Sequence, residues 1–250
     1  MYKSVKLDVN GRLLRGCVRA PEGEGPFPTG IFYHGFTVDK EGMQRLHELF
    51  ARELVKAGFA CVRFDFYGLG ESEGDFSEMT LGHEIEEAEA IYNWSLEQDF
   101  CDPDNLYISG HSQGGLICTC IAPKINPKAM VLWAPALNQY YGASLRARTM
   151  MGPTEKGWDI EGLELSRDFI EEIRKMDLRS MARGYEKPTL LIHGTEDELV
   201  PVDVAYVYQD IYGEHMRLEL IEGANHQFRS LKWKQQVYDG SVKFLLEQNS

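Results

Sequence analysis

Residues 110–114, Gly-His-Ser-Gln-Gly, constrain the fold of this chain more than any other segment. An apolar, β-prone run at 106–108 precedes them, and an apolar run at 116–122 that is typical of a buried helix follows them. Gly-X-Ser-X-Gly between a strand and a helix makes a turn so tight that only small residues fit two positions before and after the serine. Such a turn exposes the Ser112 hydroxyl at the carboxyl edge of a sheet, beside helix N–H groups that favour negative charge.

An acid and a histidine each follow a later predicted strand. Asp197 comes shortly after the strand at 189–193, and His226 comes shortly after the strand at 217–221. The carboxyl ends of parallel strands meet at one edge of a sheet, so we expect both side chains near Ser112. The chain order Ser, Asp, His differs from the orders of the chymotrypsin and subtilisin types. The acids that compete with Asp197 are Glu196, Glu198 and Asp203.

These three residues permit covalent chemistry on a carbonyl group. A serine hydroxyl is a poor nucleophile by itself and needs a base within hydrogen-bond reach. We predict that His226 is this base and that Asp197 fixes the tautomer of its imidazole. The oxygen that becomes negative during attack needs two donors, for which we expect the backbone N–H groups of Gln113 and Phe36. The alternatives are that Ser112 is an ordinary turn residue and that His226 is a surface histidine.

Length and charge exclude several classes of protein. A chain of 250 residues can form one α/β domain with room for an insertion. The net charge of −13 argues against nucleic-acid binding, which needs a basic surface to meet phosphates. The charge is compatible with a soluble enzyme that acts on small neutral molecules. Whether two copies form a homodimer stays open at this point.

Cysteine use and the amino terminus indicate a compartment. The five cysteines are odd in number and lie mostly in apolar patterns, which favours buried free thiols in a reducing compartment. No pair has zinc-ligand spacing with neighbouring histidines, so we expect no metal and no cofactor. The amino terminus lacks the apolar core of a signal peptide, and no run is long enough to span a bilayer. We therefore expect a cytoplasmic protein that does not contact membranes.

Alternating strand and helix patterns predict a mostly parallel sheet with helices on both faces. Residues 4–19 alternate around Asn10-Gly11, which predicts an antiparallel hairpin ahead of that sheet. The later strands are expected at 30–33, 60–64, 106–109, 129–133, 189–193 and 217–221. The helices are expected at 43–57, 83–96, 116–122, 202–212 and 232–247.

The alternation breaks once, and the break predicts an insertion. Residues 135–185 show no convincing strand pattern, yet they are too long for a plain connection. We expect them to form an inserted cap over the site, with residues 1–134 and 186–250 forming the core. Extra helices packed on the flank of the core are the alternative.

Aromatic side chains in the insertion are candidates for contact with a substrate. Tyr140 and Trp158 are the residues we single out, and core packing is an equal alternative for Trp158. An amphipathic helix is expected around Leu165, Phe169 and Ile173, because these residues would share one face.

On these motifs the chain resembles the α/β-hydrolase superfamily over nearly its whole length. The small size, the His-Gly-Phe turn at 34–36 and the insertion look most like bacterial cinnamoyl (feruloyl) esterases. The resemblance implies hydrolysis of hydroxycinnamate esters, with a small-molecule ester as the binding partner and an acyl-enzyme intermediate. It also implies catalytic roles for Ser112, Asp197 and His226, and oxyanion-hole roles for Phe36 and Gln113. The matching segments are 34–36, 65–72, 110–114, 193–197 and 223–226.

Other activities on the same fold stay open. A general carboxylesterase or a monoacylglycerol-type lipase would use the same three residues with an aliphatic pocket. A serine aminopeptidase would need a group for the substrate amine, and Asp159, Glu161 and Glu164 are candidates. A receptor without catalysis would usually have lost the serine or the histidine, and both are present here.

Overall fold

A computed structural model describes residues 1–137 and 150–249 and contains the expected strands and helices. The strands of the main sheet are β1 (Tyr2–Val9), β2 (Arg12–Arg19), β3 (Phe27–Tyr33), β4 (Ala60–Phe64), β5 (Cys101–His111), β6 (Met130–Trp133), β10 (Thr189–Gly194) and β11 (Met216–Ile221). The helices that pack on this sheet are α1 (Leu46–Lys56), α2 (Leu81–Leu96), α3 (Gln113–Ile125), α7 (Asp203–Tyr212) and α8 (Leu231–Gln248). Three short 3-10 helices are η1 (Met43–Arg45), η2 (Phe76–Glu78) and η3 (Gly213–His215).

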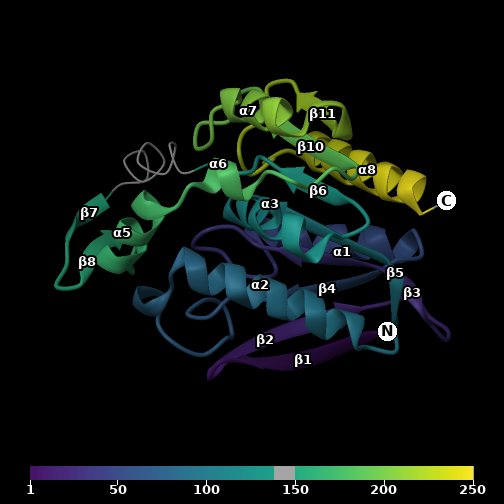
Figure 1. Cartoon of the computed structure of the whole chain (residues 1–250), viewed down its shortest axis with the longest axis horizontal. Coiled ribbons are helices and arrows are strands. Elements are labelled where there is room, and N and C mark those ends of the chain that lie inside the picture. The colour runs from purple at the N-terminus through teal and green to yellow at the C-terminus, as the bar shows by residue number, and fades with distance from the viewer. Residues whose placement is uncertain (138–149, 250) are drawn as a thin grey trace.

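The eight strands form one twisted sheet in the order β1-β2-β4-β3-β5-β6-β10-β11 (Figure 1). The β1–β2 and β2–β4 pairs are antiparallel, and all pairs from β4 to β11 are parallel. Every residue of β4 and β10 is buried, as expected for parallel strands that helices cover on both faces. The predicted fold class is confirmed.

The amino-terminal hairpin follows from its two turn residues. Asn10 and Gly11 have φ angles of 55° and 84°, which are those of a primed turn whose twist matches the flanking strands. Asp8 stabilises the turn by accepting a hydrogen bond at 3.0 Å from the Gly11 N–H. The hairpin brings β2 beside β4, so it extends the parallel sheet at one edge.

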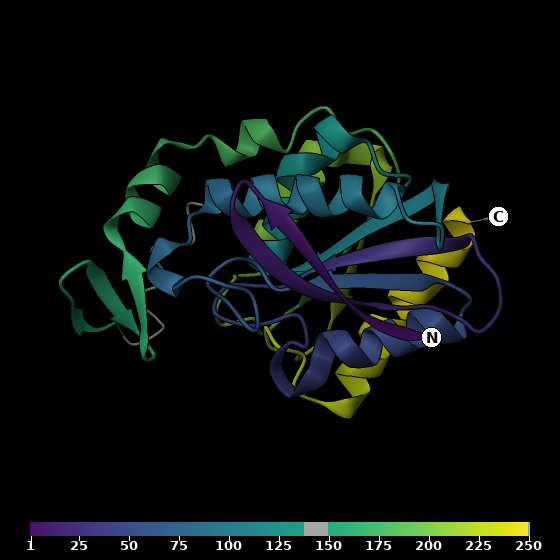
Figure 2. The same ribbon diagram turned by 90° about the horizontal axis from the view of Figure 1, so that it is seen from below.

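Helices cover the sheet in two layers (Figure 2). One apolar core joins the sheet to α2, α3 and α7, and a second joins its opposite face to α1 and α8. The carboxyl ends of β5, β10 and β11 lead into the segments that carry the predicted site. Among the described helices, none has the length and apolar character that crossing a membrane requires.

The segment between β6 and β10 holds a small sheet that the sequence did not reveal. Its described elements are β7 (Met150–Pro153), β8 (Gly157–Ile160), β9 (Leu163–Ser166), α5 (Arg167–Lys175) and α6 (Leu178–Met181). The three strands pair antiparallel and extend from one end of the main fold (Figures 1 and 2).

The expectation that this segment has no strands is therefore wrong, and Leu165 lies in β9 rather than in the amphipathic helix. Each strand has only four residues, too few for the alternation of apolar and polar residues to stand out. Glu161 and Gly162 form the turn with φ angles of 54° and 90°, and Glu-Gly is not among the common signals for such a turn. Phe169 and Ile173 do lie in a helix, α5, on its buried side.

Candidate active site

The turn that carries Ser112 is fixed by backbone crowding. Ser112 has φ 56° and ψ −118°, a strained conformation for a residue with a side chain. A Cβ atom on Gly110 would lie 2.3 Å from the carbonyl carbon of Gly114. A Cβ atom on Gly114 would lie 2.1 Å from the carbonyl oxygen of Tyr33. Only glycine fits at either position, so β5, the turn and α3 hold Ser112 in the geometry of a nucleophile elbow.

The turn after β3 lies directly against Ser112. A Cβ atom on Gly35 would lie 3.2 Å from Ser112 Cβ and 3.8 Å from Ser112 Oγ. His34 holds this turn, because its Nδ1 donates to the Gly35 carbonyl at 2.9 Å and its Nε2 accepts from the Phe66 N–H at 3.0 Å. The structure thus brings the predicted oxyanion turn, which includes Phe36, next to the serine.

The ring of Phe36 connects the oxyanion turn to the insertion. Its centroid lies 5.4 Å from that of Phe76 in η2 and 5.5 Å from that of Phe169 in α5. Pairs of aromatic rings at such separations contribute about 0.5–1.5 kcal/mol beyond their buried area. Helix α5 therefore touches the side chain whose backbone N–H is a predicted donor.

Asp197 and His226 form a buried hydrogen-bonded pair. His226 Nδ1 lies 2.7 Å from Asp197 Oδ2, so the ring donates this hydrogen bond to the carboxylate. Asp197 Oδ1 accepts from the N–H groups of Leu199 at 2.9 Å and Val200 at 2.8 Å. With Nδ1 engaged as donor, Nε2 of His226 is the nitrogen left to accept a proton.

His193, at the end of β10, adds a second contact to the same acid. Its Nε2 lies 3.3 Å from Asp197 Oδ2 and 2.9 Å from the carbonyl of Val200. Burial raises the pKa of Asp197, but the charge of His226 and hydrogen bonds to His193 and His226 outweigh burial and hold that pKa well below its usual range. Asp197 is therefore ionised at neutral pH.

His111, the residue before Ser112, contacts the loop that carries His226. Its Nε2 lies 2.9 Å from the carbonyl oxygen of His226, and the two ring centroids are 4.9 Å apart. Its Nδ1 has a long contact of 3.5 Å with His47 Nε2 in α1. Burial, with His226 beside it, lowers the pKa of His111 to about 3, so the ring is neutral and donates through Nε2.

The structure thus pairs Asp197 with His226 and places the turn at Gly35 against Ser112, but it gives a different picture of the insertion. Trp158 lies half-buried in β8, beside Leu165 of β9, and packs against the apolar core. Tyr140 falls outside the described residues. The contact of His111 with the His226 carbonyl was not predicted, because it joins elements far apart in the chain, whereas His193 contacts residues only four and seven positions away.

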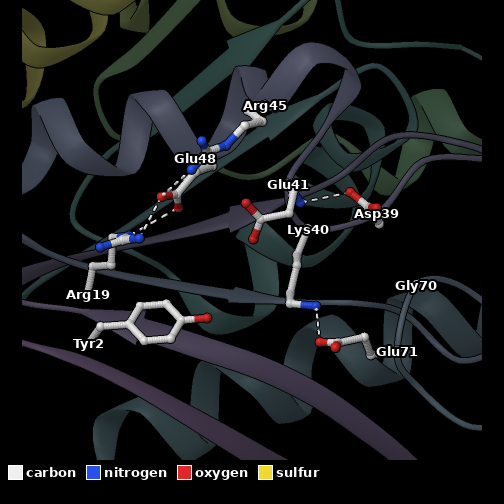
Figure 3. A pocket seen from close by; sticks show the side chains of 9 residues that line it. All are labelled: Tyr2, Arg19, Asp39, Lys40, Glu41, Arg45, Glu48, Gly70 and Glu71. Carbon is white, nitrogen blue, oxygen red and sulfur yellow. Dashed lines mark hydrogen bonds and ion pairs between the residues drawn. The ribbon is translucent and has the colours of Figure 1, made fainter.

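A separate charged hollow of about 520 Å³ lies elsewhere on the surface (Figure 3). Within it Arg19 pairs with Glu48, and Lys40 pairs with Glu71. Its charges therefore largely neutralise one another. Its lining consists of Tyr2, Arg19, Asp39, Lys40, Glu41, Arg45, Glu48, Gly70 and Glu71, and includes none of the predicted site residues.

The five cysteines are buried free thiols, as expected. Burial raises the pKa of Cys61 and of Cys120 to about 12, which keeps both thiols protonated and unreactive. Across residues 1–137 and 150–249, no group of three or more His, Cys, Asp or Glu side chains is arranged to hold a metal ion.

The protein has the α/β-hydrolase fold. Its mostly parallel sheet carries a nucleophile elbow after β5, an acid after β10 and a histidine after β11. The chain belongs to the family described as serine aminopeptidase, S33, whose model matches residues 29–166, more than half of its length. The match covers the elbow and ends in β9, before Asp197 and His226.

Relatives with similar sequences include several hydrolases. The chain is 26% identical to the lysophosphatidylserine lipase ABHD12 of Danio rerio, over 76% of this chain and 49% of that protein. It is 22% identical to the esterase EstD of Thermotoga maritima, over 90% of this chain and 60% of that protein. An uncharacterized protein of Escherichia coli is 34% identical over 39% of this chain. The chain spans only a third of that Escherichia coli protein and about half of the Danio rerio lipase.

Solved structures match over nearly the whole chain. Est1E from Butyrivibrio proteoclasticus, solved with ferulic acid bound, is 26% identical, covers 98% of both chains and superposes with a TM-score of 0.82. The α/β hydrolase GrgF from Penicillium is 16% identical with a TM-score of 0.79, which shows the shared fold alone.

Proposed function

We propose that this protein is a serine carboxylic-ester hydrolase that cleaves hydroxycinnamate esters through an acyl-enzyme intermediate. The observation that carries the proposal is the 2.7 Å hydrogen bond between His226 and the ionised Asp197. A second hydrogen bond, from His111 to the His226 carbonyl, connects the loop that carries His226 to the turn that carries Ser112. An activated serine beside a turn of backbone N–H groups serves acyl transfer.

In the proposed reaction, Ser112 Oγ attacks the ester carbonyl carbon while His226 Nε2 takes the hydroxyl proton. Asp197 keeps the imidazole in the required tautomer and stabilises its positive charge. The backbone N–H groups of Gln113 and Phe36 bind the negative oxygen of the tetrahedral intermediate. The proton then passes to the leaving alkoxide, and water hydrolyses the acyl-enzyme by the same steps in reverse.

The substrate class rests on the match to Est1E, which extends over 98% of both chains and includes bound ferulic acid. We assign residues 135–185 the role of a cap over the site, on the evidence that Phe169 of α5 packs on Phe36 of the oxyanion turn. Trp158 and Tyr140 stay the proposed contacts of this cap with the aromatic acyl group.

A general carboxylesterase or a lipase is the second candidate, which the similarity to EstD and to the lysophosphatidylserine lipase favours. The family description favours an aminopeptidase. An aminopeptidase needs an acid to bind the substrate amine. Of the three candidates, Asp159 Oδ1 accepts from the Gly162 N–H at 2.8 Å and Glu164 Oε1 lies 3.4 Å from the Lys156 N–H, so Asp159 and Glu164 serve the turns of the small sheet. Glu161 is exposed in the turn after β8 and stays the candidate for that role.

The test is kcat/KM for methyl ferulate, p-nitrophenyl butyrate, a monoacylglycerol and an aminoacyl-anilide, with the wild type and Ser112→Ala. We expect the wild type to prefer methyl ferulate, and Ser112→Ala to lose at least about 10⁴-fold in kcat on every ester with an unchanged melting temperature. The control is Ser4→Ala in β1, which should behave as the wild type. A Ser112→Ala variant that kept its activity would overturn the mechanism, and a preference for butyrate would overturn the substrate class only.

A further inference from the structure

A buried acid that the proposed mechanism does not use lies next to the elbow. Glu84, in the first turn of α2, is 1% exposed, and its Oε2 accepts a hydrogen bond from Nε2 of Gln113. Gln113 is also 1% exposed; it follows Ser112 and begins α3. One side chain of α2 therefore holds the residue whose backbone N–H is a proposed oxyanion donor.

Glu84 and the neighbouring buried acid, Glu87, differ in the partners that stabilise a negative charge. Glu87, one turn later in α2, accepts hydrogen bonds from Arg12 Nε at 2.7 Å and from the Tyr67 N–H at 3.1 Å. In the described part of the chain, no lysine or arginine pairs with Glu84. Burial therefore raises the pKa of Glu84 well above its usual range, and Glu87 and Glu172 raise it further.

Retaining a carboxyl group in such a place is costly for stability, since an apolar side chain of similar volume would avoid the loss of solvation. What the carboxyl group provides is an acceptor for the Gln113 amide at a defined point. The backbone around Gln113 needs such a fixed point, because Ser112 next to it is strained at φ 56°.

We infer that Glu84 is a positioning residue for the reaction: through the Gln113 side chain it fixes the start of α3, and with it the backbone N–H of Gln113 that binds the oxyanion. This inference rests on the proposed function. The hydrogen bond from the Gln113 backbone N–H stabilises the transition state, in which the substrate oxygen is negative, more than it stabilises the neutral ester. Displacement of this N–H should therefore lower kcat and leave KM nearly unchanged.

The test compares Glu84→Gln with Glu84→Met, two neutral side chains of similar length. Glu84→Gln retains a carbonyl acceptor for the Gln113 amide, and Glu84→Met does not. Complete loss of one oxyanion donor costs about 10²–10³-fold in kcat, and displacement of a donor should cost less. We expect kcat to fall roughly 10–30-fold in Glu84→Met with KM within about threefold, and Glu84→Gln to stay within about threefold of the wild type.

Two further measurements separate positioning from a loss of stability. Affinity for a boronic acid, which forms a tetrahedral adduct with the serine, should fall in Glu84→Met by about the same factor as kcat/KM. Gln113→Ala should lower kcat to a similar extent, and adding Glu84→Met to it should cost little more, because both changes break one contact. Glu89→Met, on the same helix and paired with Lys124 at the surface, is the control.

The inference is overturned if Glu84→Met and Glu84→Gln have equal kcat values, or if the double variant shows additive losses. If Glu84→Met does not fold, Gln113→Ala and its boronate affinity decide the question: wild-type values overturn the inference. Failure of the proposed function looks different, because Ser112→Ala would then retain activity. If Ser112→Ala is inactive and the Glu84 variants match Glu89→Met, only the present inference fails.

Discussion

His111 Nε2 donates a hydrogen bond at 2.9 Å to the backbone carbonyl of His226. The contact joins the elbow after β5 to the loop after β11, which lie far apart in the chain. It acts on the backbone of the proposed base rather than on its imidazole, so it sets where the base lies without changing which nitrogen accepts the proton.

From this relationship we predict a loss of activity in His111→Phe. Phenylalanine fills similar space but has no donor, so the His226 carbonyl loses a buried partner, which costs about 1–3 kcal/mol at most. We expect kcat/KM for p-nitrophenyl butyrate to fall roughly tenfold and the melting temperature to drop by a few degrees. His215→Phe, in η3 and away from the site, is the control. Unchanged kinetics in His111→Phe would mean that the loop needs no support from the elbow.

A second prediction concerns the dependence of stability on pH. Burial raises the pKa of Glu87 to about 7, against 4.5 for the free side chain, and this outweighs the hydrogen bond from Tyr67 and the charge of Arg12. Between these two values the folded state holds a proton that the unfolded state has lost. The contribution of Glu87 to stability is thus most favourable below pH 4.5, declines as pH rises to 7 and is constant above it.

The measurement is the free energy of unfolding in urea at pH 5 and pH 8. Relative to Glu87→Gln, which does not titrate, the wild type should lose on the order of 2–3 kcal/mol over this range. Glu89→Gln, at the surface of the same helix, should follow the wild type. Parallel pH profiles for the wild type and Glu87→Gln would contradict the assignment.

The third prediction tests Trp158 as a wall of the substrate pocket. If its ring contacts the aromatic acyl group, Trp158→Ala should lower kcat/KM for methyl ferulate by roughly tenfold more than for p-nitrophenyl butyrate. Trp94→Ala is a matched control, because Trp94 packs on Phe64 and Phe100 in the main core. It should affect both substrates equally. Equal losses in Trp158→Ala, with a lowered melting temperature, would assign the ring to the packing of the small sheet.

The parts of the fold that sequence predicts well are those that local patterns determine. Asn10-Gly11 specifies its hairpin, and the elbow glycines specify the turn at Ser112, because each needs only its immediate neighbours. The pairing of Asp197 with His226 followed from their places after adjacent parallel strands. The contact of Glu84 with Gln113 could not be predicted, since it depends on how α2 packs against α3. The strands β7–β9 were missed because each has only four residues.

The crowding at Gly110 and Gly114 has a consequence for how such a protein can change. The geometry of Ser112 is set by main-chain atoms of β3, β5, β6 and α3, and by Ala136, whose N–H donates to the Ser112 carbonyl at 3.0 Å; no main-chain atom of α5 is among these contacts. Residues 135–185 are one continuous segment of the chain between β6 and β10. Exchange of residues 137–185 between related enzymes, which keeps Ala136, should therefore alter which esters are accepted and leave the main-chain contacts of Ser112 unchanged. A chimaera that lost its reactivity toward an active-site fluorophosphonate would indicate that the exchanged segment and the core evolve together. A chimaera that retained this reactivity would show that the core is a modular scaffold on which new selectivity can be built.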